Sequence, residues 1–165
     1  MKEILDKISS YNFFNYLLPG IIFVVILDIF TPYSFIQEDI IIGLFIYYFI
    51  GLIISRLGSL VIEPILKHFS FLKFTDYNDF VLASKRDKKI GLFVQENNVY
   101  RTFVSMFFLV LFLKFYEFIE IKFLISEEWS LFILIILLLT IFIYSYRKQT
   151  NYIAKRINFI NKQDI

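Results

Sequence analysis

The chain has no cysteine and only one histidine, His68. Without cysteine it has no disulfide framework and no thiolate chemistry, and a lone histidine cannot build a metal site of the usual His/Cys kind. The glycine-rich, nucleophile and HExxH motifs of nucleotide-binding proteins, hydrolases and metalloproteases do not occur in its 165 residues. The sequence therefore predicts a protein that is not an enzyme, with no catalytic residue, no metal and no cofactor.

Charged residues are also scarce, since they make up 19% of the chain against 58% hydrophobic and 21% aromatic residues. A soluble domain of this length does not normally hide so much apolar surface. A helix needs about 20 mainly apolar residues to cross a bilayer. Four stretches approach that length: about 11–30, 40–62, 100–118 and 129–146. We predict an all-α polytopic membrane protein with four transmembrane helices in a single membrane domain, 1–165.

Two polar segments separate or follow these stretches. Between the second and third helices lies a segment, 64–99, in which Asp76 is placed to cap a short helix. The last segment, 147–165, contains no helix breaker, so the fourth helix is expected to project beyond the bilayer. A basic cluster in the first segment suits anionic lipid or a soluble protein partner, whereas direct nucleic-acid binding is not expected from so small a net charge. The cluster consists of Lys85, Arg86, Lys88 and Lys89.

The distribution of Lys and Arg predicts the orientation. Loops that carry an excess of these residues stay in the cytoplasm. Only Lys114 and Lys122 fall on the side that follows the first and third helices, against 14 Lys and Arg on the other side. Both termini and the segment 64–99 are therefore predicted to be cytoplasmic. The 14 residues are Lys2, Lys7, Lys67, Lys73, Lys85, Arg86, Lys88, Lys89, Arg101, Arg147, Lys148, Lys155, Arg156 and Lys162.

Small residues form a stripe on the second helix. Small side chains let the backbones of membrane helices approach closely, which is how such helices associate in lipid. The stripe is expected to be a packing seam, either within one chain or between copies of it. Its members are Gly43, Gly51, Ser55, Gly58 and Ser59.

Five charged residues fall within or at the ends of the predicted spans. A charge in hydrocarbon costs about 3 kcal/mol on insertion scales, so it is usually paired or reaches an interface. Arg56 and Glu63 lie near the predicted cytoplasmic end of the second helix, where other helices or lipid headgroups are expected to provide partners. Asp28, Lys114 and Glu117 lie near the opposite face. The shared depth motivates the hypothesis of an ion pair between Asp28 and Lys114, and the alternative is that each residue simply faces the outer headgroups.

The first helix contains the dipeptide Pro19-Gly20 close to its entry into the bilayer. Proline removes a backbone hydrogen bond and glycine adds backbone freedom, so this step is a candidate hinge. Kinks without any function are common in membrane helices, and plain packing is the alternative.

Four short segments in the first two thirds of the chain combine small, aromatic and charged residues. They are Asn15-Tyr16-Leu17-Leu18-Pro19-Gly20, Gly51 with Ser55-Arg56-Leu57-Gly58-Ser59, Glu63-Pro64-Ile65-Leu66-Lys67, and Tyr100-Arg101-Thr102. In these segments the chain resembles small uncharacterised bacterial four-helix membrane proteins, some of which are membrane subunits or effectors of anti-phage defence systems. The matching residues are structural, so the resemblance assigns no functional residue.

The resemblance implies a membrane effector or anchoring subunit of a defence system in the bacterial cytoplasmic (inner) membrane. We expect a homo-oligomer that responds to a soluble cytoplasmic protein. It either opens a pore or serves only as a membrane anchor and sensor. A lumen would be lined by polar residues such as Arg56, Glu63, Ser55 and Ser59. The alternatives are a small ion channel or transporter of ordinary physiology and a scaffold for another membrane complex.

Overall fold

The computed structural model describes residues 10–161, and within this range every regular element is a helix. Four continuous helices are long and apolar enough to cross a membrane: Ser10–Phe30, Ile40–His68, Lys89–Phe123 and Glu127–Asn161. The prediction of an all-α protein with four such helices is thereby confirmed.

The first two long helices each contain a short wider turn. The first consists of α2 (Ser10–Asn12), the wide turn η1 (Phe13–Leu17) and α3 (Leu18–Phe30), and the second consists of α4 (Ile40–Leu57), η2 (Gly58–Ile62) and α5 (Glu63–His68). A short helix, α6 (Tyr77–Arg86), precedes the two longest ones, α7 (Lys89–Phe123) and α8 (Glu127–Asn161). The side chains of Asp39 and Asp76 cap α4 and α6 by accepting hydrogen bonds from backbone N–H groups of the first turn.

The two wide turns explain how these helices continue through proline. Proline has no N–H and its ring clashes with the carbonyl four residues earlier. Pro19 and Pro64 each lie two residues after a wide turn, where the preceding N–H bonds to the carbonyl five residues back: Leu18 to Phe13, and Glu63 to Gly58. The wider turn relieves the clash, so neither proline ends its helix.

The helix boundaries differ from the predicted ones at three places. The second helix runs past Glu63-Pro64 to His68, and α7 begins at Lys89 instead of residue 100 and ends at Phe123 instead of residue 118. The apolar run of α7 begins near residue 100, but the polar residues before it are compatible with a helix in water. Much of the segment 64–99 therefore belongs to α5 and α7, and the helical projection expected of the tail is present as far as residue 161.

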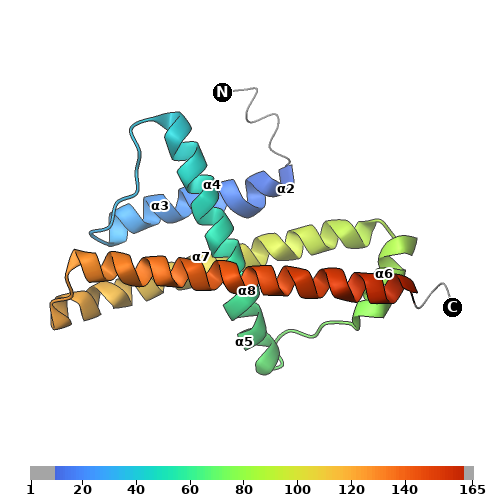
Figure 1. Cartoon of the computed structure of the whole chain (residues 1–165). Helices are drawn as coiled ribbons and strands as arrows, with labels where there is room; N and C mark the ends of the chain where they lie inside the picture. Colours follow the sequence, from blue (N-terminus) through green and yellow to red (C-terminus); the bar gives the residue numbers. More distant parts are fainter. Residues whose placement is uncertain (1–9, 162–165) are drawn as a thin grey trace.

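The helices are arranged around α4. Figure 1 shows α8 passing in front of α4 and α7 passing behind it, while α3 packs against both α4 and α7. The buried core lies between α3, α4 and α7, and α8 contributes little to it because only 6% of its apolar window is buried. The core residues are Phe23, Val24, Leu27, Ile54, Met106 and Val110.

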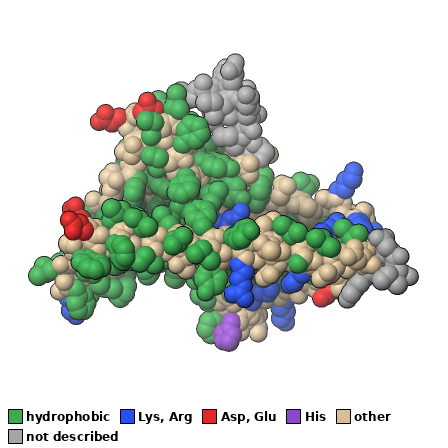
Figure 2. Space-filling view, viewed as in Figure 1, with side chains coloured by type: hydrophobic (Ala, Val, Ile, Leu, Met, Phe, Trp, Pro, Cys, Tyr) green, Lys and Arg blue, Asp and Glu red, His purple; other side chains and the backbone are tan. Residues whose placement is uncertain are grey.

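Charges of opposite sign gather at different ends of the molecule. Figure 2 shows most of the visible Lys and Arg side chains along the C-terminal half of α8, and most of the visible Asp and Glu side chains toward the opposite end. Hydrophobic side chains cover much of the surface between them. Such an apolar surface is suited to a lipid environment.

Replacing Gly51 with alanine should destabilise the fold by about 1–3 kcal/mol, because the new Cβ would collide with the backbone of Tyr16. Gly91, in the exposed first part of α7, is the matched control, since a Cβ there meets nothing within 4 Å. Gly91→Ala should stabilise α7 by about 0.5–1 kcal/mol through helix propensity. Thermal unfolding in detergent measures both, and equal melting temperatures for the two variants would contradict the close contact between η1 and α4.

Candidate functional site: a polar cluster around helix α4

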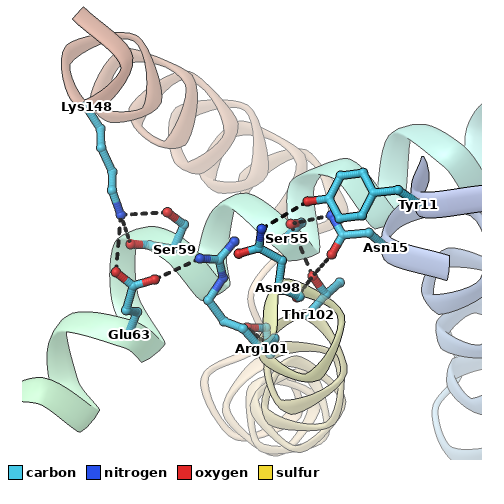
Figure 3. Close-up of polar contacts among 10 residues, drawn as sticks. Tyr11, Asn15, Ser55, Ser59, Glu63, Asn98, Arg101, Thr102 and Lys148 are labelled. Carbon is cyan, nitrogen blue, oxygen red and sulfur yellow. Dashed lines mark hydrogen bonds and ion pairs between the residues drawn. The ribbon is translucent and has the colours of Figure 1, made fainter. Parts of the chain in front are cut away.

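A carboxylate shared by two cations connects three helices. The side chain of Glu63 accepts a hydrogen bond from Arg101 Nη1 at 2.7 Å and lies 3.8 Å from Lys148 Nζ. These residues come from α5, α7 and α8, and Figure 3 shows them converging beside α4. Their side chains are only 15–27% exposed, so each charge depends on the others for stabilisation. We call Glu63, Arg101, Lys148 and Ser59 the charged cluster.

Ser59 joins this cluster because of the wide turn in which it lies. Lys148 Nζ donates to the Ser59 carbonyl at 2.7 Å and to Ser59 Oγ at 2.6 Å. In a regular α-helix the Glu63 N–H would occupy that carbonyl, but here it bonds to Gly58 instead. The next residue is Pro64, which has no N–H to offer. The helix thus leaves the Ser59 carbonyl available, and the ammonium group of Lys148 takes it.

A second, uncharged group of polar side chains lies next to the charged cluster (Figure 3). Asn15, Ser55 and Thr102 are at most 4% exposed. The Thr102 hydroxyl lies 2.9 Å from Asn15 Oδ1 and 3.1 Å from Ser55 Oγ, and Asn15 Nδ2 donates to Ser55 Oγ at 3.3 Å. These three residues, which we call the neutral cluster, connect the first helix, α4 and α7. At its edge, Asn98 Nδ2 donates to the Tyr11 hydroxyl at 3.2 Å.

The stripe of small residues faces different neighbours along its length. Gly51 lies against the backbone of Tyr16, and Gly58 lies against Ser105 and Arg101 of α7. Ser55 and Ser59 belong to the neutral and charged clusters. Gly43 instead lies against the ring of Tyr47 from its own helix. Four of the five residues therefore face other helices of the same chain.

The Pro19-Gly20 step lies inside a packed contact. Both residues are buried, and a Cβ on Gly20 would collide with the Tyr47 carbonyl. Glycine at this position allows α3 and α4 to approach backbone to backbone. A hinge motion here would have to separate the two helices.

The other charged residues that the sequence places within or near the spans are not part of the charged cluster. The expected Asp28–Lys114 pair is not formed: Lys114 pairs with Glu117, three residues away on α7, at 2.7 Å, and Asp28 is exposed. An i,i+3 pair lets two charges satisfy each other locally on one helix face. Arg56 does not pair with Glu63, whose partners are on α7 and α8. The basic cluster Lys85, Arg86, Lys88 and Lys89 is exposed around the α6–α7 junction.

A polar group at the other end of α7 involves the loop 31–39. The Tyr33 hydroxyl donates to Glu120, which also accepts from Ser130 of α8 at 2.9 Å, and Tyr116 donates to Ser130 at 2.9 Å. Burial, together with the hydrogen bond to Glu120, raises the pKa of Tyr33 above its ordinary value. The phenol therefore stays protonated as a donor at neutral pH.

Sequence reasoning missed four members of the two clusters: Asn15, Arg101, Thr102 and Lys148. Arg101 and Lys148 were interpreted only as loop charges that set the orientation. A signal was present in α7, where Asn98, Arg101 or Thr102, and Ser105 recur at three- and four-residue spacing on one face. The described residues contain no group of three or more His, Cys, Asp or Glu that could hold a metal ion.

Replacing Glu63 with glutamine should destabilise the protein by about 2–3 kcal/mol, because Arg101 and Lys148 would keep partly buried charges without a carboxylate. Glu117→Gln is the control and should cost less than about 1 kcal/mol, since its partner Lys114 is exposed. Thermal unfolding in detergent compares them. If the two variants unfold at the same temperature, Glu63 does not hold the helices together.

No protein-family model, curated protein or solved structure matches this chain. The interpretation of the two clusters therefore depends on the chemistry of the chain itself.

Proposed function

We propose that this protein is a non-enzymatic membrane effector or anchoring subunit of a bacterial anti-phage defence system in the cytoplasmic membrane. It oligomerises and responds to a soluble cytoplasmic protein. The observation that carries the proposal is the charged cluster, which ties α5, α7 and α8 together at the point where α7 and α8 leave their apolar runs. A partner that binds the projecting parts of these helices can therefore act on the cluster directly.

The assignment to defence is supported by the resemblance of four short segments. Those segments contribute Asn15, Ser55, Glu63, Arg101 and Thr102, which meet in the two clusters although they are far apart in the sequence. The resemblance therefore concerns residues that touch one another, and not four unrelated pieces of helix.

The exposed side of α8 is available for oligomerisation. Its apolar window is almost entirely unburied within the chain, so no other helix of the same chain covers it. Lipid and further copies of the chain are the surroundings that this face suits.

The pore version of the effector requires polar contacts within the chain to break, which the anchoring version does not. Ser55, Ser59 and Glu63 make hydrogen bonds or ion pairs within the chain. A lumen lined by them can form only if the charged cluster comes apart, so in this version the resting protein is closed and the partner opens it.

The proposed orientation puts the loops 31–39 and 124–126 outside and the α6–α7 junction and the end of α8 in the cytoplasm. The absence of cysteine makes this directly testable with single cysteines. Ser34→Cys and Ser126→Cys should react with a membrane-impermeant maleimide on intact spheroplasts. Lys88→Cys and Lys155→Cys should react only after permeabilisation, and labelling of either one before it would overturn the orientation. Lys2, Lys7 and Lys162 lie outside the described residues.

The effector proposal predicts that the chain, expressed with its neighbouring genes, lowers phage plaque counts, and that Glu63→Gln changes this protection while Glu117→Gln does not. In liposomes holding a potassium gradient, the pore version predicts depolarisation by the wild type only with its partner, and by Glu63→Gln without it. Absence of depolarisation in every case would leave the anchoring version. Plaque counts unaffected by the whole gene set would overturn the defence assignment.

A further inference from the structure

A small cavity between α4 and α8 lies directly beside the charged cluster. It has a volume of ≈ 30 Å³, which is room for about two water-sized groups. Its lining is rich in hydrogen-bond donors and contains no carboxylate. The lining residues are Arg56, Ser59, Leu60, Ser145, Lys148, Gln149 and Tyr152.

Positive charge around this cavity exceeds the negative charge available within the chain. Two cations, Arg56 and Lys148, line the cavity, and the carboxylate of Glu63, which pairs with Lys148, is shared with Arg101. Among residues 10–161, no ion pair or hydrogen bond involves the Arg56 guanidinium. A guanidinium that is only partly exposed and has no partner within the chain favours an anionic partner.

A second observation independently indicates a missing ligand atom. The hydroxyl oxygen of Ser145 is buried, lines the cavity and has no hydrogen-bond partner in the described part of the chain. Leaving such a group unpaired is unfavourable, so it favours a ligand atom in the cavity. An oxyanion can accept from Ser145, Arg56 and Lys148 at the same time.

The depth of the cavity identifies the kind of oxyanion. Lys148 lies 21 residues after the first residue of α8, Glu127, which corresponds to about 32 Å of helix. The hydrocarbon layer is about 30 Å thick. With Glu127 at the opposite interface and α8 along the membrane normal, as the proposed span requires, the cavity is at the level of phospholipid phosphates. Basic pockets between membrane helices at this level are suited to anionic headgroups.

We propose that Arg56, Lys148 and Ser145 bind the phosphate group of an anionic phospholipid, with two of its oxygens in the cavity and the acyl chains along the exposed face of α8. The chemistry required is that of a phosphate oxyanion, and the lipid is its source because the turn of α8 that precedes the cavity exposes apolar side chains, among them Phe142 and Ile143. This site does not depend on the proposed role in defence.

Native mass spectrometry of the full-length, delipidated protein tests the proposal with added phosphatidylglycerol and phosphatidylcholine. Phosphatidylglycerol should bind about tenfold more tightly, because both lipids carry the phosphate but the choline cation of phosphatidylcholine is repelled by Arg56 and Lys148. Arg56→Gln should remove this preference, and Ser145→Ala, which deletes a donor to the phosphate, should weaken phosphatidylglycerol binding about threefold. Arg147→Gln is the matched control, because Arg147 is an exposed neighbour of Lys148 outside the cavity, and should leave the preference unchanged.

Three outcomes would overturn the proposal: equal binding of the two lipids, equal effects of Arg56→Gln and Arg147→Gln, or displacement of phosphatidylglycerol by millimolar inorganic phosphate. The last would assign the cavity to free phosphate instead of lipid. If Arg56→Gln does not fold in detergent, Ser145→Ala decides, and an unchanged affinity for phosphatidylglycerol in that variant counts against the site.

Discussion

The carboxylate of Glu63 is the group on which the arrangement of the long helices depends. It faces Arg101 of α7 and Lys148 of α8, and these two helices have few other contacts with each other in this part of the molecule. In a protein whose helices are surrounded by apolar material, hydrophobic burial does not distinguish helix–helix from helix–lipid contact. A charge interaction with little access to water can then fix which helices meet and at which level.

The wide turn at Gly58–Ile62 allows Lys148 of α8 to bind beside Glu63. Pro64 requires a change in the hydrogen-bond pattern of its helix, and the wider turn shifts the Glu63 N–H to Gly58. The same shift leaves the Ser59 carbonyl to accept from Lys148. A single proline thus affects both where the helix widens and which backbone group is available to α8.

The hydrogen bonds of the neutral cluster help to fix how three helices are placed relative to one another. Asn15, Ser55 and Thr102 have few alternative partners in their buried positions, so their hydrogen bonds specify one relative placement of the first helix, α4 and α7. The glycines next to them, Gly20 and Gly51, bring the backbones of α3 and α4 close enough for these short side chains to reach. The close approach of the helix backbones and the hydrogen bonds of the neutral cluster therefore depend on each other.

The sequence by itself determined the helical class, the number of long apolar helices and most of their starts, because a bilayer requires long apolar runs that are visible without any tertiary information. It also indicated the stripe of small residues and the cap at Asp76. Only the tertiary structure decided which polar residues meet. Asn15, Glu63, Arg101 and Lys148 lie on separate helices, and their pairing depends on how α4 passes between α7 and α8. The continuation of the second helix through Pro64 was likewise invisible in the sequence, because the wide turn that permits it is a local adjustment held by contacts with the other helices.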